Sequence, residues 1–396
     1  MHPKIKKMTE NKNFEIIVKT LAELEPILEN ELKALGAKDI KKGNRAVSCT
    51  GNNETLYRIN YESRTALRVL KPITQVIANN PQKLYNEVKK IPWENFLNNE
   101  KTFAINSRVY SEIFEHSQFV TLKIKDAIVD RFREQTGERP SIDTKNPDIR
   151  INIFIQNDIC NISLDSSGDP LYKRGYKEKL GMAPLNEVLA AGMILLSGWE
   201  AKTDFVDFMC GAGTIVVEAG MIALNVPPQI NRDNFAFKNW KDYDPKLWQK
   251  IKEEAKAKIK KEDDVECHIF ASDISLNAIM QTRQNVKNVF HEQIFTIKKS
   301  AFDKLELPES AKHIVINPPY GERLQKTDTD LLYKKIGDEL KTKYSGSEAW
   351  ILGGNLQSVK KVGLRPSKKI TLYNGAIECK FLKYEMYKGS KKMKKE

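Results

Sequence analysis

The residues with the clearest chemical potential are Asn317-Pro318-Pro319-Tyr320, which directly follow a predicted strand at 313–316. Two successive prolines fix the backbone and remove two N–H donors, which leaves the Asn317 amide oxygen and the Pro318 carbonyl as a rigid row of acceptors. Such a row suits an exocyclic amine, because an amine has two N–H groups to donate. Holding both hydrogens out of the ring plane localises the nitrogen lone pair and aims it at a methyl donor. Tyr320 offers a face on which a flipped base can stack.

A glycine turn follows a second predicted strand, 204–208, in the run from Asp207 through Cys210, Gly211 and Gly213 to Thr214. A tight glycine turn at the carboxyl end of a strand lets a ligand approach the backbone closely. The run lacks the third glycine of the dinucleotide motif and the Lys-Ser/Thr pair of a phosphate loop. This pattern disfavours NAD and ATP and leaves S-adenosylmethionine (SAM), although the turn alone is equally consistent with a structural role.

Two acidic residues follow the next two predicted strands. Asp273 ends the strand at 268–272, where a carboxylate can accept hydrogen bonds from both ribose hydroxyls. The alternative is a helix N-cap for 275–289, but the preceding glycine turn favours the ribose. Asp303 follows the strand at 294–298 and is either an acceptor for the adenine amine or a solvated loop carboxylate. For Asp303 both interpretations stay open.

These motifs lie in a stretch of alternating strands and helices that begins near residue 170. A further strand is predicted at 348–352, and the predicted helices are 186–196, 214–224, 275–289, 331–344 and a short one at 356–361. A terminal hairpin, 369–373 with 376–384, surrounds Asn374-Gly375. This order predicts a doubly wound α/β sheet with an antiparallel edge. Residues 226–266 interrupt the alternation with aromatic residues and a helix rich in lysine and glutamate.

The first 168 residues follow a different order. Strand 14–19, helix 23–35, strands 39–42 and 46–49, helix 54–61 and strand 66–76 give the β-α-β-β-α-β order of a small ferredoxin-like unit. A second α/β unit follows, with helices at 81–90 and 118–134 and strands at 102–108, 149–156 and 159–164. We therefore expect domains at 1–70, 71–168 and 169–388, followed by a basic tail at 389–396.

Length, charge and cysteine content limit the classes of protein to which the chain can belong. A chain of 396 residues has room for two or three domains. Its net charge of +13 favours an anionic partner, most often nucleic acid, although a merely lysine-rich composition gives the same number. Five scattered cysteines without a CxxC pair indicate a reducing compartment and no structural zinc. The charged N-terminus is not a signal peptide and no apolar run spans a bilayer, so a cytoplasmic location without membrane contact is expected.

The Asn-Pro-Pro-Tyr run after a DxxCGxG strand resembles class I SAM-dependent methyltransferases that act on amines. Further runs narrow the resemblance: Gly321-Glu322-Arg323-Leu324, Lys173-Arg174-Gly175-Tyr176, Ala183-Pro184-Leu185 and Asn374-Gly375. Together they are similar to the bacterial THUMP-domain 23S ribosomal RNA guanine-N2 methyltransferase family over nearly the whole chain. The resemblance implies an α/β fold, in which a ferredoxin-like domain and an RNA-binding THUMP domain precede a Rossmann-like class I methyltransferase sheet. It also implies a single methyltransferase unit, whereas some relatives carry two.

The resemblance also implies roles for individual residues. The methionine end of SAM lies against Asp207, Cys210, Gly211 and Gly213, the ribose at Asp273 and the adenine at Asp303, while Pro184 and Leu185 form a wall. The target base is held by Asn317, Pro318, Pro319 and Tyr320. RNA contacts are expected at Arg108, His116, Lys173, Arg174, Lys177 and Arg323, although Arg108 and His116 also suit a structural role. No metal is expected.

The expected activity is methyl transfer from SAM to guanine N2 in large-subunit ribosomal RNA, either naked or in an assembling particle. The oligomeric state is left open. One alternative is an N6-adenine or other amine methyltransferase, against which the THUMP-like half and the Gly-Glu-Arg-Leu run argue. The other is a non-catalytic RNA-binding protein with a decayed fold, against which the intact glycine turn, Asp273 and Asn317 argue.

Overall fold

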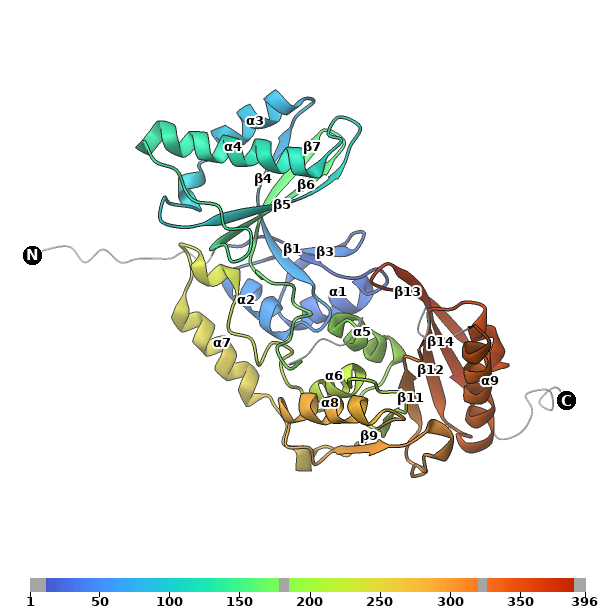
Figure 1. The fold of residues 1–396 in the computed structure, drawn as a ribbon. Helices are drawn as coiled ribbons and strands as arrows, with labels where there is room; N and C mark the ends of the chain where they lie inside the picture. The colour runs from blue at the N-terminus through green and yellow to red at the C-terminus, as the bar shows by residue number, and fades with distance from the viewer. Residues whose placement is uncertain (1–11, 178–184, 320–325, 388–396) are drawn as a thin grey trace, which may run out of the picture.

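The computed structural model describes residues 12–177, 185–319 and 326–387. Within these ranges the chain forms two seven-stranded sheets, one from each half of the sequence (Figure 1). The α/β architecture predicted from the sequence is confirmed. No helix in the described ranges is long and apolar enough to cross a membrane.

The N-terminal sheet begins with a ferredoxin-like unit. Its elements are β1 (Phe14–Lys19), α1 (Glu25–Ala34), β2 (Lys38–Lys42), β3 (Ala46–Gly51), α2 (Asn53–Glu62) and β4 (Arg68–Ile77). The second unit adds α3 (Pro81–Lys90), η1 (Trp93–Asn95), β5 (Phe103–Tyr110), α4 (Ser117–Thr136), β6 (Ile149–Gln156) and β7 (Ile159–Asp165). The strand order across the sheet is β2-β3-β1-β4-β7-β6-β5. The two units predicted from the sequence therefore share one sheet.

Strand β4 joins these two units. Residues 68–70 of β4 pair with β1, and residues 70–77 pair with β7. The domain boundary that the sequence predicts after residue 70 thus falls inside a continuous strand. One hydrophobic core, which includes Val47 and Leu56 of the first unit and Phe103 and Ile128 of the second, extends across both.

The C-terminal sheet has the doubly wound order β10-β9-β8-β11-β12-β14-β13. Its strands are β8 (Phe205–Asp207), β9 (Ile269–Asp273), β10 (Phe295–Lys299), β11 (His313–Ile316), β12 (Glu348–Gly353), β13 (Lys368–Asn374) and β14 (Ile377–Glu385). The first five are parallel, whereas β14 runs antiparallel to both β12 and β13. The strand order reverses between β8 and β11, which is where folds of this kind bind their ligands.

Helices cover both faces of this sheet. They are α5 (Glu187–Ser197), α6 (Thr214–Ala223), α8 (Leu276–Lys287) and α9 (Lys326–Lys343), with short 3₁₀ helices η4 (Phe302–Lys304) and η6 (Ser358–Val362). Apolar residues of α5, α6 and α8 share one core, and those of α9 and η6 share another, which places these two groups on opposite faces. The short helix predicted at 356–361 is 3₁₀, with Asn355 accepting hydrogen bonds from two following N–H groups.

The interrupting segment 226–266 packs onto the N-terminal half. It contains η2 (Ala236–Asn239), α7 (Pro245–Ala257) and η3 (Glu262–Asp264). Phe237 stacks on Tyr57 of α2 at 4.4 Å between ring centroids, and Trp248 of α7 packs edge-on against Tyr61 of α2 at 5.4 Å. This aromatic cluster joins the segment to the N-terminal half, and α2 and α7 lie side by side in Figure 1.

Candidate active site

A cavity of about 1010 Å³ lies at the carboxyl ends of the C-terminal strands. Its walls include the glycine turn after β8, Asp273 at the end of β9, Asp303 in η4 and Asn317 after β11. Motifs that lie more than a hundred residues apart in the sequence therefore meet around one space. This is the position at which the strand order reverses, as the sequence predicts for a ligand site.

The glycine turn has the conformation that only glycine adopts easily. Gly211 and Gly213 have φ values of 53° and 76°, both in the left-handed region. A Cβ on Gly213 would lie 2.6 Å from Cγ2 of Thr282, so close packing against α8 also requires glycine there. Thr282 and Asn285 of α8 donate hydrogen bonds to the carbonyls of Gly211 and Ala212, each at 2.8 Å. These two contacts fix the turn.

Asp273 connects the turn to the next strand. Its Oδ2 accepts from the Gly211 N–H at 3.0 Å, and its Oδ1 accepts from the Ser275 N–H at 2.8 Å. The N-cap of α8 is Ser275, whose hydroxyl accepts from the Ala278 N–H. The capping role considered for Asp273 therefore belongs to Ser275. Each carboxylate oxygen of Asp273 has capacity for a further hydrogen bond, and the residue lines the cavity.

Asp207 is buried at the end of β8, with 1% of its surface exposed. The pKa of this carboxyl is raised to about 8, mainly by burial; the hydrogen bond from the Met209 N–H opposes the shift and the nearby Asp273 adds to it. The uncharged carboxyl is thus favoured at neutral pH in the ligand-free protein. A cation placed against Asp207 would favour the carboxylate instead.

The acceptor row after β11, formed by the Asn317 amide oxygen and the Pro318 carbonyl, contains one acceptor without a hydrogen bond. Oδ1 of Asn317 is buried and accepts no hydrogen bond from any described residue. Asn317, Pro318 and Pro319 all line the cavity. A buried acceptor without a donor costs about 1–3 kcal/mol, so a bound N–H group at this point has a built-in partner.

The remaining predicted cofactor residues differ in position. Leu185 and Cys210 line the cavity, but Gly213 does not, because it faces Thr282. The Cys210 thiol is buried, which raises its pKa well above the ordinary value, so it contributes bulk rather than a nucleophile. Pro184, Tyr320 and Arg323 lie outside the described residues.

Two of the predicted RNA contacts have partners inside the protein. Arg174 is 1% exposed, and its guanidinium donates to Glu218 at 3.3 Å and to the Arg64 carbonyl at 2.6 Å. Lys177 is also buried, with its Nζ 2.9 Å from a carboxylate oxygen of Glu187. Buried cations need such partners, and of the two residues Lys177 also lines the cavity. The side chains of Arg108, His116 and Lys173 are exposed, as an RNA contact requires.

Several cavity residues were not predicted from the sequence. Phe302 follows β10, and α9 contributes Asp328, Leu331, Leu332 and Lys335. Thr282 and Asn285, which fix the glycine turn, were also missed. The signal for these two was their polarity three residues apart on the buried side of a predicted helix, where apolar residues are usual.

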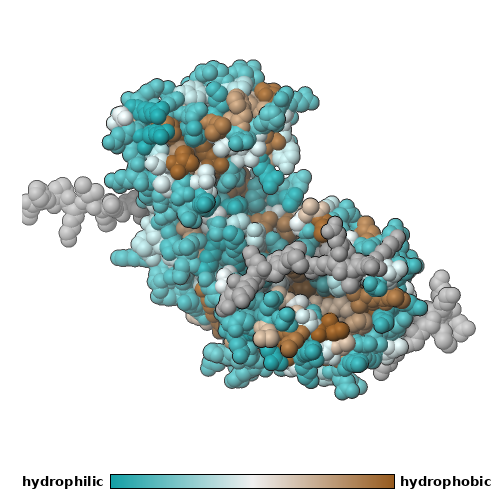
Figure 2. Space-filling view, viewed as in Figure 1, coloured by the Kyte–Doolittle hydropathy of each residue, from teal (hydrophilic) through white to brown (hydrophobic). Residues whose placement is uncertain are grey.

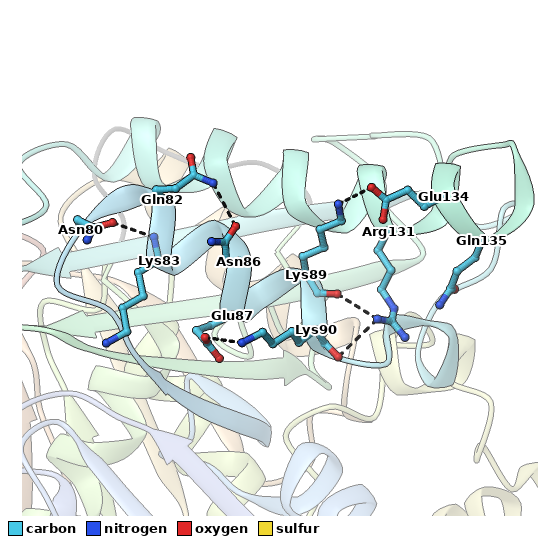
Figure 3. A pocket seen from close by; sticks show the side chains of 10 residues that line it. All are labelled: Asn80, Gln82, Lys83, Asn86, Glu87, Lys89, Lys90, Arg131, Glu134 and Gln135. Atoms are coloured by element: carbon cyan, nitrogen blue, oxygen red, sulfur yellow. Dashed lines mark hydrogen bonds and ion pairs between the residues drawn. The ribbon is translucent and has the colours of Figure 1, made fainter.

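A second hollow, of about 770 Å³, lies between α3 and α4 (Figure 3). Lys89 pairs with Glu134 and Lys90 with Glu87, and Arg131 donates to Glu94 and to the Lys89 carbonyl. The charges that line this hollow mostly satisfy one another, unlike the acceptor row after β11. In the described part of the chain no group of three or more His, Cys, Asp or Glu side chains is arranged to hold a metal ion.

Three family models match the chain, and they follow one another in the same order as the units of the fold. Residues 15–70 match the RlmL ferredoxin-like domain, residues 78–165 the THUMP domain and residues 174–383 the RMKL-like methyltransferase domain. A Synechocystis protein named as a candidate RNA methyltransferase is 37% identical over 92% of this chain and 94% of its own. The ribosomal RNA large subunit methyltransferase K/L of Syntrophotalea carbinolica is 38% identical. This chain spans about half the length of that relative, 52%.

Solved structures share the whole fold. SMU.472, a candidate methyltransferase crystallised with SAH, has a TM-score of 0.85 and 28% identity over 96% of this chain and 100% of its own. A Listeria monocytogenes protein, described from its sequence as an N6-adenine-specific DNA methylase, has a TM-score of 0.84 and 26% identity, covering 95% of this chain and 97% of its own. The names of these similar proteins thus agree on methyl transfer and differ on the substrate.

Proposed function

Because the chain belongs to the RMKL-like methyltransferase family, we propose that it methylates the N2 amine of a guanine in large-subunit ribosomal RNA with SAM as the methyl donor. The observation that carries the proposal is the buried Asn317 oxygen, which has no donor among the described residues, in a cavity that also contains the glycine turn and Asp273. An acceptor of this kind suits an N–H donor, and the exocyclic amine of a base supplies two.

The residues of the cavity fit SAM, whose sulfonium supplies the methyl group when it is bound. Asp207 suits the positively charged amine at the methionine end, and Asp273 suits the ribose hydroxyls. The turn at Gly211 brings backbone close to the ligand without a side chain in between. Asp303 and Leu185 form walls of the same cavity, as expected for the adenine end and the cofactor wall.

Residues of this chain position the amine of the target base. Asn317 Oδ1 and the Pro318 carbonyl accept the two amine hydrogens and hold the nitrogen lone pair toward the methyl donor. Pro318 and Pro319 keep the row rigid, so that the acceptors need not reorganise when the base arrives. Tyr320 remains our candidate for stacking on the flipped base.

We assign RNA binding to the N-terminal half, with a ferredoxin-like domain at 1–70 and a THUMP domain at 71–168, ahead of the methyltransferase domain at 169–388. The net charge of +13 and the exposed Arg108 and His116 support this assignment, and the exposed Lys173 extends the candidate RNA contacts into the start of the methyltransferase domain. A cytoplasmic location, where ribosomal RNA is modified, belongs to the same proposal.

The test is the identity of the product. Purified protein, labelled SAM and deproteinised large-subunit RNA should give N2-methylguanosine after nucleoside digestion. Asn317→Ala should lower the single-turnover rate by roughly 10²–10³ with little change in SAM affinity, whereas the exposed Asn86→Ala should behave as wild type. N6-methyladenosine as the product would favour the adenine alternative, and a full rate for Asn317→Ala would contradict the role of the acceptor row.

A further inference from the structure

The cavity has one wall whose role the family match does not assign, and it comes from α9. Asp328, Leu331, Leu332 and Lys335 line the cavity. Their spacing of three, four and seven residues places them on one face of a helix over two turns. The opposite side of α9 carries Tyr333, Ile336 and Leu340, which are buried in the core beneath it. The helix therefore presents a defined stripe to the cavity.

The two ends of this stripe carry opposite charges. Asp328 and Lys335 form no hydrogen bond or ion pair among the residues that the structure describes. Several other charged residues of α9 are paired, since Lys341 lies 3.6 Å from Asp338 and Lys343 lies 2.8 Å from Glu339. Asp328 and Lys335 therefore face the cavity without a partner among the described residues, and Lys334, on a side of α9 away from the cavity, has none there either.

The stripe and the acceptor row together contain the donors and acceptors that complement the polar edge of guanine. Read along that edge, guanine presents the two N2 hydrogens, then the N1 hydrogen, then the O6 acceptor. The cavity offers acceptors at Asn317, a further acceptor at Asp328 and a donor at Lys335. Positions 328 and 335 are about 10 Å apart along the axis of α9, and the long side chain of Lys335 can reach back toward Asp328.

We propose that Asp328 and Lys335 select guanine, with Asp328 accepting the N1 hydrogen and Lys335 donating to O6. The inference rests on the proposed function, because it takes the N2 amine to lie on Asn317. Adenine with its N6 amine on Asn317 places an N1 lone pair beside Asp328 and offers nothing to Lys335. The arrangement therefore rejects adenine by repulsion at one group and by a missing partner at the other.

The experiment compares guanine with 2-aminopurine at a mapped target position in a synthetic RNA. 2-Aminopurine keeps the N2 amine but has no O6 and has a lone pair in place of the N1 hydrogen. For the wild-type protein, kcat/KM should be about a hundredfold higher with guanine, or roughly tenfold for each contact. Lys335→Met should lower the guanine value about tenfold and leave the 2-aminopurine value unchanged.

Asp328→Asn should also reduce the preference, and its amide can donate to N1 of 2-aminopurine, so that substrate should improve. Lys335→Arg keeps the donors and should retain the preference. Lys334→Met and Asp338→Asn make the same chemical changes on α9 away from the cavity and serve as matched controls with the wild-type ratio.

The outcomes distinguish a failure of base selection by α9 from a failure of the proposed function. Equal losses on both bases in Lys335→Met and Asp328→Asn would overturn base selection, because a backbone contact or a folding defect affects both substrates alike. Thermal unfolding of each variant identifies a folding defect independently. If the wild-type protein methylates no guanine N2 at all, the proposed function fails instead.

Discussion

We predict that Asp207 makes cofactor binding depend on pH. Its pKa is raised to about 8 by burial, so at pH 6 and 7 the carboxyl is mostly protonated in the ligand-free protein. A bound ammonium group requires the carboxylate, and binding must then release a proton. SAM affinity should rise about tenfold from pH 6 to pH 7. Calorimetry in buffers of different ionisation enthalpy measures both the affinity and the proton released.

The same shift predicts the effect on stability. Because the folded-state pKa lies above the unfolded value of about 3.9, the ligand-free fold loses stability as pH rises from about 4 to about 8. Asp207→Asn should remove this loss and raise the thermal midpoint at pH 8, while it weakens SAM binding and abolishes its pH dependence. An affinity that stays constant between pH 6 and 7 in the wild-type protein would contradict the role given to Asp207.

For individual residues, the sequence predicted which side chains line the cavity better than it predicted which charged side chains are exposed. The spacing of Asp207, Gly211, Asp273 and Asn317 after successive strands suffices, because parallel strands bring their carboxyl ends together. The burial of Arg174 could not be predicted, since its partner Glu218 lies 44 residues away on α6. A local pattern of basic residues indicates a solvated surface and carries no information on such a partner.

Among the elements, α7 has the clearest structural role. Trp248 contacts Tyr61 and Phe237 at ring centroid distances of 5.4 and 5.2 Å, and it is buried between the two halves of the molecule. Trp248→Ala should cost about 3–5 kcal/mol of unfolding free energy, the range for a large buried aromatic. Lys256→Ala, on the exposed side of α7, is the matched control. Denaturant unfolding measures both, and an unchanged midpoint for Trp248→Ala would show that α7 is not part of the core.

Local periodicity predicted most elements to within a few residues. The sequence places a helix at 81–90 and a strand at 149–156, and α3 and β6 have those bounds. The continuity of β4 across two units and the packing of α7 on α2 were not predicted. Both depend on pairing between distant segments, which the period of a single segment does not encode.

For the molecule as a whole, RNA binding should depend strongly on salt. Much of the surface in Figure 2 is hydrophilic, with apolar patches on both lobes. Each phosphate contact adds about one to the slope of log affinity against log salt. Arg108→Ala should reduce that slope by about one, whereas Lys202→Ala, whose side chain pairs with Glu200, should not. Fluorescence anisotropy with labelled ribosomal RNA at several salt concentrations measures the slopes, and equal slopes would remove Arg108 from the interface.

The most direct test of the account uses ribosomal RNA from cells that lack this protein. Mass spectrometry of the large-subunit nucleosides should show the loss of N2-methylguanosine at one position, with other methylated nucleosides unchanged. The wild-type gene should restore the modification, and a gene carrying Asn317→Ala should not, although the variant protein accumulates and binds SAM. An unchanged N2-methylguanosine content in the deletion strain would contradict the central claim.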